Sequence, residues 1–529
     1  MTPKETIETG RACLGIEFGS TRIKAVLVDE NNTPIAQGSH TWENQLVDGL
    51  WTYQLEAIWF GLQDCYRDLC ADVEKRYGCA ITSLRRIGVS AMMHGYMPFD
   101  ADGKLLASFR TWRNTNTGEA AAELSKLFNF NIPLRWSIAH LYQAILNGES
   151  HVLQITFLTT LAGYIHWQLT GEKVLGIGDA SGMMPIDAST KQYNAGMVKL
   201  FDDLAATKGF GKPLLDILPA VLLAGEEAGT LTEEGAKRLD ISGRLQAGIP
   251  FCPPEGDAGT GMVATNAVRQ RTGNVSAGTS SFSMIVLERA LSQPYESIDI
   301  VTTPDGNDVA MVHCNNCTSD LNAWVGIFDE FCKLTGCEMP VGELYSTLYN
   351  HALKGDNDCG GVISYNFFSG EPVAGLTEGR PMLVRSVADH FNLANLMRSM
   401  LCASVAVLKI GNDILFGQEH VKVDRITGHG GLFKTPGVGQ RILAAALGTP
   451  ISVMETAGEG GAWGMALLAN YSASADGLSL DKWLDMKVFA GNTGSEIAPT
   501  PDEVSGFNSY IERYIAALPV EQAAISHLN

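Results

Sequence analysis

The sequence predicts an α/β protein with two layered domains. The chain has 529 residues, which is too long for one hydrophobic core. β-type runs alternate with helical patterns along its whole length. A hairpin pattern near the N-terminus also recurs about half a chain later. Since 45% of the residues are apolar, the composition is that of a globular protein.

The first hairpin pattern reads LGIEFGSTRIKAVLVD over residues 14–29. Apolar residues alternate with small or acidic ones, the chain bends at Gly-Ser-Thr, and a second β-rich run follows. The stretch GNVSAGTSSFSMIVLE, residues 273–288, repeats this arrangement, with its bend offset by 278 − 19 = 259 residues. Two such hairpins indicate two similar domains, each opening with a hairpin.

A glycine bend flanked by hydroxyls and a cation suits phosphate binding. Glycine exposes backbone N–H groups and lets an anion approach, while Ser20, Thr21 and Lys24 add donors and charge. Glu17 is unsuited to direct phosphate contact, but it suits Mg²⁺ or its waters because that ion takes hard oxygen ligands. The alternatives are an ordinary turn and a half-exposed strand carboxylate.

Other segments complete the expected α/β pattern. Strands are expected at residues 85–91 and 424–427, and helices over residues 50–67, 158–169, 392–415 and 439–447. Because no linker tract separates the halves, the domain crossing is expected near PPEGDAGTG, residues 253–261. This divides the chain into domains at 12–262 and 263–515.

Asp257 is the sharpest single candidate for chemistry. It sits between glycines in PPEGDAGTG, where a helix N-cap is expected. A capping role is one interpretation. The other is a carboxylate that accepts a hydroxyl proton during phosphoryl transfer, kept ionised by the helix N-terminus.

A second group of residues has the types that bind sugars. SAMMHGYMPF carries His94 after an expected strand, and TWRNTNT carries Trp112 and Arg113. Such side chains offer a ring for stacking and polar heads for hydroxyls. A purely structural histidine is the alternative for His94.

The charge balance and the cysteines bear on location and partners. Acidic residues exceed basic ones by 58 − 38 = 20, which argues against a nucleic-acid or anionic-membrane surface. The N-terminal MTPKETIETGRA has no apolar signal region, and no run approaches the about 18 apolar residues of a membrane span. With eleven scattered cysteines, we expect a cytoplasmic protein. A zinc site is possible from the spacing, although buried thiols are favoured, at Cys314, Cys317, Cys332 and Cys337.

The order of these motifs resembles that of the FGGY carbohydrate kinases, within the actin-like ATPase superfamily, over residues 12–515. GIEFGSTRIKAVLVD is similar to the family's opening phosphate hairpin, and SAMMHG to the Met-His-Gly segment of xylulokinases. EGDAGTG resembles the segment with the catalytic base, and SAGTSS the second phosphate hairpin. QLTGEKVLGIGDASGMM, FFSGE and GHGGLFKTP also follow in the family's order.

The resemblance implies two actin-like (ribonuclease H-like) domains around a central cleft, with ATP and Mg²⁺ as cofactors. The reaction implied is transfer of the γ-phosphoryl group to a hydroxyl of a small sugar, with Asp257 as the base and a sugar ligand. Glu17 and Asp257 would hold the metal, and His94, Trp112 and Arg113 would bind the sugar. ATP would be bound by Gly19, Ser20, Thr21, Lys24, Gly278, Thr279, Gly430, Gly431 and Thr435.

Departures from the family pattern keep the acceptor open. Glu17 stands where the family usually has Asp, and TWRNTNT does not keep the Trp-Asn-Asp-x-Arg pattern. The Met-His-Gly segment favours D-xylulose, with L-ribulose, another ketose or a polyol as alternatives. A further alternative is an actin-like ATPase or sugar-sensing regulator without kinase activity. Many such kinases dimerise, so a homodimer is possible.

Overall fold

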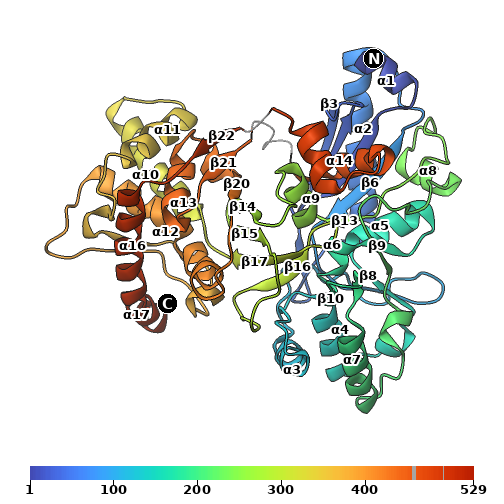
Figure 1. Ribbon diagram of the computed structural model, residues 1–529, viewed down its shortest axis with the longest axis horizontal. Coiled ribbons are helices and arrows are strands. Elements are labelled where there is room, and N and C mark those ends of the chain that lie inside the picture. The colour runs from blue at the N-terminus through green and yellow to red at the C-terminus, as the bar shows by residue number, and fades with distance from the viewer. Residues whose placement is uncertain (455–459, 492–493, 529) are drawn as a thin grey trace. The chain divides into compact units, whose positions relative to one another are not determined.

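The computed structural model describes residues 1–454, 460–491 and 494–528 (Figure 1). The chain forms two compact units, each assembled from three segments. Unit 1 comprises Met1–Arg269, Gln293–Val309 and Glu459–Gly491, and unit 2 comprises Gln270–Ser292, Ala310–Gly458 and Asn492–Asn529. The division at residues 262 and 263 stays a prediction, while the mixed α/β character of both units confirms the predicted fold class.

The central sheet of unit 1 has the strand order β13-β6-β1-β2-β3. Its strands are β13 (Glu255–Gly256), β6 (Arg86–Ala91), β1 (Cys13–Phe18), β2 (Arg22–Val28) and β3 (Pro34–Thr41). β1 and β2 form the predicted hairpin, while β6 runs parallel to both β1 and β13. The buried core of the unit lies on this sheet and contains alternating strand residues such as Leu14, Ile16 and Phe18.

Helices and short strands surround this sheet. The helices of unit 1 are α1 (Pro3–Glu8), α2 (Leu55–Tyr77), α3 (Gly118–Phe128), α4 (Ser137–Leu146), α5 (Leu161–Thr170), α6 (Ile177–Ala180), α7 (Ala195–Thr207), α8 (Glu233–Leu239), α9 (Asp257–Ala264), α14 (Gly460–Ser474) and α15 (Leu480–Trp483). Its other strands are β4 (Gln45–Val47), β5 (Leu50–Thr52), β7 (Met97–Phe99), β8 (Phe157–Thr159), β9 (Val174–Gly176), β10 (Ile186–Asp187), β11 (Gln192–Tyr193), β12 (Ala220–Leu222) and β16 (Asp299–Thr302).

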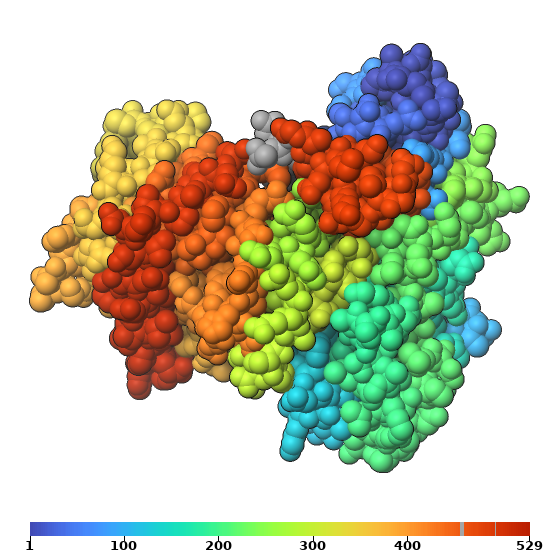
Figure 2. All heavy atoms as spheres, viewed as in Figure 1, coloured from blue at the N-terminus to red at the C-terminus, as the bar shows by residue number. Residues whose placement is uncertain are grey.

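Helix α14 returns from late in the sequence to unit 1 and packs on β1 and α9 (Figure 1). In Figure 2, this orange-red segment lies beside the blue N-terminal part of the chain. The approach is close because glycines face it. A Cβ on Gly15 of β1 would lie 2.2 Å from the Ala462 carbonyl, and a Cβ on Gly464 would lie 2.0 Å from that of Thr260. The small residues of AGEGGAWGMALLA therefore serve helix packing, although residues 457–459 of that stretch lie outside the described residues.

The sheet of unit 2 repeats the arrangement of unit 1. Its strands run in the order β17-β15-β14-β20-β21-β22, with β14 antiparallel to β15 and parallel to β20. An antiparallel hairpin with a parallel neighbour is also what β1, β2 and β6 form, which confirms the repeat seen in the sequence. The bounds are β14 (Thr272–Ala277), β15 (Ser281–Val286), β17 (Asp308–Cys314), β20 (Arg425–His429), β21 (Ile451–Val453) and β22 (Ser495–Ile497).

The other elements of unit 2 are mostly helices. They are α10 (Ser319–Thr335), α11 (Val341–Ala352), α12 (Leu393–Asp413), α13 (Val438–Leu447), α16 (Pro501–Ala516) and α17 (Leu518–His527), with the short strands β18 (Ile363–Tyr365) and β19 (Met382–Val384). Of the four predicted helices, α12 and α13 agree closely. Those predicted at residues 50–67 and 158–169 begin later, because β5 and β8 occupy their first residues.

One helical segment among the described residues, Leu393–Gln418, is long and apolar enough to cross a membrane. The expectation that no segment reaches this length is therefore wrong. α12, which makes up most of it, packs against α11 and α13, and 67% of the segment's most apolar window is buried inside the protein. Core helices meet the same length and composition criteria.

We predict that Gly15→Ala destabilises the protein by about 1–3 kcal/mol, the usual cost of overpacking a core. The added methyl group would overlap the backbone of α14, which cannot rotate away. Urea unfolding measures the effect. Gly118→Ala in α3 is the control, because a Cβ there meets no atom within 4 Å. Equal stability of the two variants would contradict the packing described.

Candidate functional site

A row of polar side chains crosses one end of the unit 1 sheet. The strand register places Glu255 beside Ser90, Ser90 beside Glu17, and Glu17 beside Lys24. Neighbours in register point to the same face of a sheet. The hairpin thus brings the carboxylate and the ammonium of the sequence motif together across two strands.

Glu17 lies under the first turn of α14. A Cβ on Gly461 would lie 2.2 Å from Glu17 Oε1 and 2.8 Å from the Thr260 hydroxyl, so only glycine leaves room for this carboxylate. Burial and the charge of Asp257 raise the pKa of Glu17 to about 7, against the opposing effects of Lys24 and of a hydrogen bond from the Ala462 backbone. The Glu17 side chain therefore fits here because position 461 is a glycine.

Asp257 is the first residue of α9, and Gly256 is the N-cap. The expectation that Asp257 is the N-cap is thus wrong by one residue. Its Oδ1 accepts the backbone N–H of Met93 at 3.1 Å, across from the end of β6. Part of Asp257 remains accessible. Burial raises its pKa to about 6, so the helix terminus does not hold the pKa at its ordinary value.

Aromatic side chains hold the bend of the first hairpin from behind. Trp42 Nε1 donates to the Gly19 carbonyl at 2.8 Å, and the Tyr53 hydroxyl donates to the Ser20 carbonyl at 2.6 Å. The two rings stack with centroids 4.1 Å apart. With these carbonyls satisfied, Ser20 and Thr21 stay on the accessible side of the bend. The sequence interpretation missed Trp42 and Tyr53, because isolated aromatics resemble ordinary core residues.

Trp112 and Arg113, predicted to bind sugar, have protein partners. The Trp112 indole N–H donates to the Ser20 hydroxyl at 3.1 Å, which joins the TWRNTNT segment to the hairpin bend. The exposed Arg113 guanidinium stacks 3.6 Å from the centre of the Trp51 ring. Trp112 therefore supports the bend and Arg113 contacts Trp51, while the role of both toward a sugar stays a prediction.

His94 occupies a strained position beside the Asp257 contact. Its φ of 69° is in the left-handed region, which non-glycine residues adopt at a cost of about 1–3 kcal/mol and mostly at functional sites. The ring is buried, stacks on Trp136, and Nδ1 lies 3.2 Å from the Gly182 carbonyl. Met93 N–H holds Asp257, so His94 is the next residue along from that contact.

Two buried acids behind Asp257 were not predicted. The Glu255 carboxylate accepts N–H groups from Gly178, Asp179 and Gly256. Asp179 accepts the Thr160 hydroxyl at 2.6 Å through Oδ2. Burial and the charge of Asp179 raise the pKa of Glu255 to about 8, and burial and the charge of Asp257 raise the pKa of Asp179 to about 7. Their sequence signal is only an acid inside a glycine-rich stretch, so their role depends on contacts between distant segments.

The second hairpin bend in unit 2 is held by a loop. The Gly278 carbonyl accepts the backbone N–H and the hydroxyl of Thr318, and the Thr279 carbonyl accepts Cys317 N–H. The Thr279 side of the bend is exposed. As in the first hairpin, carbonyls are bonded from behind while the hydroxyl side stays open.

The glycines of GHGGLFKTP lie beside this second bend. β14 and β20 are parallel neighbours that end together, with Ser276 in register with His429. Gly430 has φ 104°, and a Cβ there would lie 2.5 Å from the Ala277 carbonyl. The fold therefore brings Gly278, Thr279, Gly430 and Gly431 to one edge of the sheet. Thr435 is buried and lies two residues beyond the short 3-10 helix Gly431–Phe433.

A zinc site from the four cysteines finds no support in the structure. Cys314 and Cys317 are buried, Cys332 is half-buried, and Cys337 is exposed just after the end of α10. The part of the chain that the structure describes holds no group of three or more His, Cys, Asp or Glu placed to share a metal ion. The buried pair matches the alternative of ordinary core thiols.

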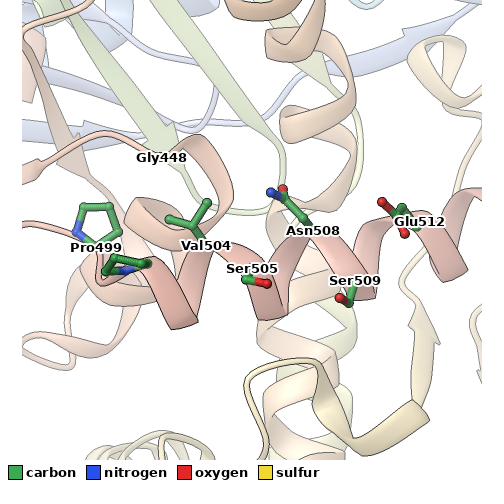
Figure 3. A pocket seen from close by; sticks show the side chains of 8 residues that line it. Gly448, Pro499, Val504, Ser505, Asn508, Ser509 and Glu512 are labelled. Carbon is green, nitrogen blue, oxygen red and sulfur yellow. The ribbon is translucent and has the colours of Figure 1, made fainter.

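A groove of about 550 Å³ runs along α16 in unit 2 (Figure 3). The figure shows Asn508, Ser509 and Glu512 projecting from this helix. None of the predicted site residues lines the groove, and its lining residues include an acid and no base. It therefore lacks the cation that a phosphate group requires.

Comparison with protein families shows which family the chain belongs to. The N-terminal domain of the FGGY family of carbohydrate kinases matches residues 12–264, and its C-terminal domain matches residues 273–473. The chain belongs to the FGGY family of carbohydrate kinases. Kinases of this family transfer a phosphoryl group to carbohydrates and use ATP as the donor.

Individual FGGY relatives are distant. Xylulose kinase from Escherichia coli is 23% identical over 292 residues, 54% of this chain and 56% of that protein. Xylulose kinase from Haemophilus influenzae is 22% identical over 84% of this chain and 91% of that protein. Autoinducer-2 kinase from Salmonella typhimurium is 21% identical over 55% and 54%. The matched part thus spans about half the length of two of these three relatives.

A solved structure shows the same fold over nearly the whole chain. The crystal structure of a xyloylose kinase from Brucella ovis superposes with a TM-score of 0.77 at 19% identity, covering 96% of this chain and 99% of that one. The FGGY fold predicted from the motif order is therefore confirmed.

We predict that Gly461→Ala destabilises the protein and that Glu17→Asp relieves the effect. The methyl group would overlap Glu17 Oε1, and the shorter carboxylate withdraws from that position. Urea unfolding of the wild type, both single variants and the double variant gives the coupling free energy, which we expect to be about 1–3 kcal/mol in favour of the double variant. Strictly additive effects would show that the two positions do not determine each other.

Proposed function

We propose that this protein transfers the γ-phosphoryl group of ATP to a hydroxyl of D-xylulose. The observation that carries the proposal is Asp257, a partly accessible carboxylate held by Met93 N–H beside the strained His94. The Met-His-Gly segment and the names of two matched relatives support a ketopentose as the acceptor. L-ribulose, another ketose or a polyol is the second candidate, because the matched relatives are not all xylulose kinases: an autoinducer-2 kinase matches at similar identity.

In the proposed reaction the acceptor hydroxyl oxygen forms a bond to the γ-phosphorus while the bond from that phosphorus to the β–γ bridging oxygen breaks, and ADP leaves. Asp257 accepts the hydroxyl proton and orients the hydroxyl for in-line attack. Because the transition state is loose, the proton moves late, and a carboxylate with a pKa of about 6 suffices at neutral pH. Lys24 and the first hairpin bend stabilise the phosphoryl charge.

A magnesium ion fits the donor set of unit 1. Glu17 and Asp257 are both partly accessible. Because the charge of Asp257 raises the pKa of Glu17, a cation bound by both carboxylates would relieve their repulsion. Both offer hard oxygen ligands, and Mg²⁺ commonly takes only one or two carboxylates from a protein. When bound, the ion neutralises charge on the phosphates. In this proposal the second hairpin bend and Gly430–Gly431, in unit 2, bind the nucleotide. The enzyme is proposed to be cytoplasmic, because all of its eleven cysteines are free thiols.

A coupled assay of ADP release with D-xylulose, L-ribulose, other ketoses and polyols tests the proposed function. We expect the largest kcat/KM with D-xylulose. A larger value with another sugar would move the assignment to that acceptor. Sugar-independent ATP hydrolysis, or no turnover with any acceptor, would instead support an actin-like ATPase or a regulator.

We predict that Asp257→Asn lowers kcat by roughly 10²–10⁴-fold, the range for loss of a general base. Asn keeps the shape and can still accept Met93 N–H through its oxygen, so sugar affinity should change far less. Steady-state kinetics and sugar binding by calorimetry provide the two measurements. If a folded Asp257→Asn protein turned over normally, Asp257 would be a structural residue of the α9 N-terminus.

For Glu17, we expect Glu17→Gln to lower kcat strongly and to raise the Mg²⁺ concentration needed for half-maximal rate, because an amide is a weaker cation ligand. Sugar binding without metal should stay the same. Glu17→Asp should retain more activity, since it keeps the charge. Rates titrated with Mg²⁺ decide the matter: normal turnover of Glu17→Gln at limiting Mg²⁺ would contradict the metal role.

A further inference from the structure

Glu255 is a fully buried acid that the proposed reaction does not use. Only 1% of it is exposed. Its Oε1 accepts Gly178 N–H at 3.3 Å, and its Oε2 accepts Asp179 N–H at 3.0 Å and Gly256 N–H at 3.3 Å. This buried carboxylate therefore links two segments of the chain: the α6 turn with Gly178 and Asp179, and β13 with Gly256.

The backbone around Glu255 is shaped to receive the carboxylate. A Cβ on Gly176 would lie 2.3 Å from Oε1, and a Cβ on Gly178 would lie 2.4 Å from Oε2. Both glycines flank the start of α6, and neither has the positive φ that would otherwise account for a glycine. At Gly178 the close approach of Glu255 alone excludes a side chain, and at Gly176 the Pro254 carbonyl, 2.8 Å from the Cβ position, adds to the effect of Glu255.

The two segments joined by Glu255 lead to the two side chains that the proposed function places at the acceptor: one carries Asp257, and the other contacts His94. On one side, Glu255 is two residues before Asp257, whose Oδ1 accepts Met93 N–H. On the other side, the turn at α6 continues to Gly182, whose carbonyl lies 3.2 Å from His94 Nδ1. Met93 and His94 are adjacent, so the contacts close a ring that runs from Glu255 through Asp257, Met93, His94 and Gly182 back to Glu255.

We infer that Glu255 is a positioning residue for phosphoryl transfer, which fixes the separation of Asp257 and His94 by tying the α6 turn to β13. It acts through backbone N–H groups and does not touch the acceptor. The kinetic part of this inference rests on the proposed function. The structural part, the ring itself, does not.

Glu255→Gln tests the inference with little change of shape. Both side-chain oxygens accept N–H groups, which the acid can do in its neutral and its ionised form, whereas an amide has one acceptor oxygen and presents a donor at the other position, so at least one N–H loses its partner. We expect kcat with the acceptor to fall roughly 10- to 100-fold, as for a small misplacement of reacting groups. The KM for ATP should not change. Glu521→Gln is the matched control, because Glu521 is also buried and accepts a backbone N–H, from Arg380, but lies in α17 of unit 2.

Hydrogen–deuterium exchange gives a readout that needs no acceptor. In Glu255→Gln, peptides with Met93 and with residues 177–182 should exchange faster than in the wild type, and in Glu521→Gln they should not. Gly178→Ala, whose methyl group would displace the same carboxylate, should reproduce both effects and replaces Glu255→Gln should that protein not fold.

Three outcomes would overturn the inference: unchanged exchange at Met93, turnover equal to that of the Glu521→Gln control, or a KM for ATP that rises as strongly as kcat falls. A wild-type protein that phosphorylates no sugar would contradict the proposed function alone, because the exchange measurement would still decide whether Glu255 holds the ring.

Discussion

The close approach of α14 to β1 and α9 is the constraint on which unit 1 depends. Glycines at positions 15 and 464 bring helix backbone directly onto strand and helix backbone, and Gly461 leaves room for the Glu17 and Thr260 side chains. This contact partly buries Glu17, gives it a backbone hydrogen bond from Ala462, and places it close enough to Asp257 for their charges to interact. The desolvation of two neighbouring carboxylates costs stability, which is common where a site is built for a cation or a reacting group.

Glycines also make room for neighbouring side chains around Asp257. Glycines at 176, 178 and 256 leave room for Glu255, Asp179 and Met93. Because interiors are close-packed, such gaps are filled by their neighbours and hold them in one arrangement. Several glycines of unit 1 are therefore explained by the room that three acids, Glu17, Glu255 and Asp179, require beside the backbone.

The sequence was informative where chemistry is local. The two hairpins, their offset of 259 residues, and the position of Asp257 follow from short motifs whose residues act close to their own position. Trp42 and Tyr53 escaped prediction because their contact with the bend depends on long-range packing. Glu255 escaped for the same reason, and Trp112 contacts Ser20 although its residue type indicated a sugar. The one-residue error at the α9 cap reflects the uncertainty of helix ends.

The central claim is that Asp257 receives the proton of the acceptor hydroxyl. A crystal structure of the protein with Mg²⁺, a non-hydrolysable ATP analogue and the best acceptor tests it most directly. The account predicts the reacting hydroxyl within hydrogen-bond distance of an Asp257 carboxylate oxygen and in line with the γ-phosphorus. An acceptor whose reacting hydroxyl faces another base, with Asp257 bonded only to Met93 N–H, would contradict it.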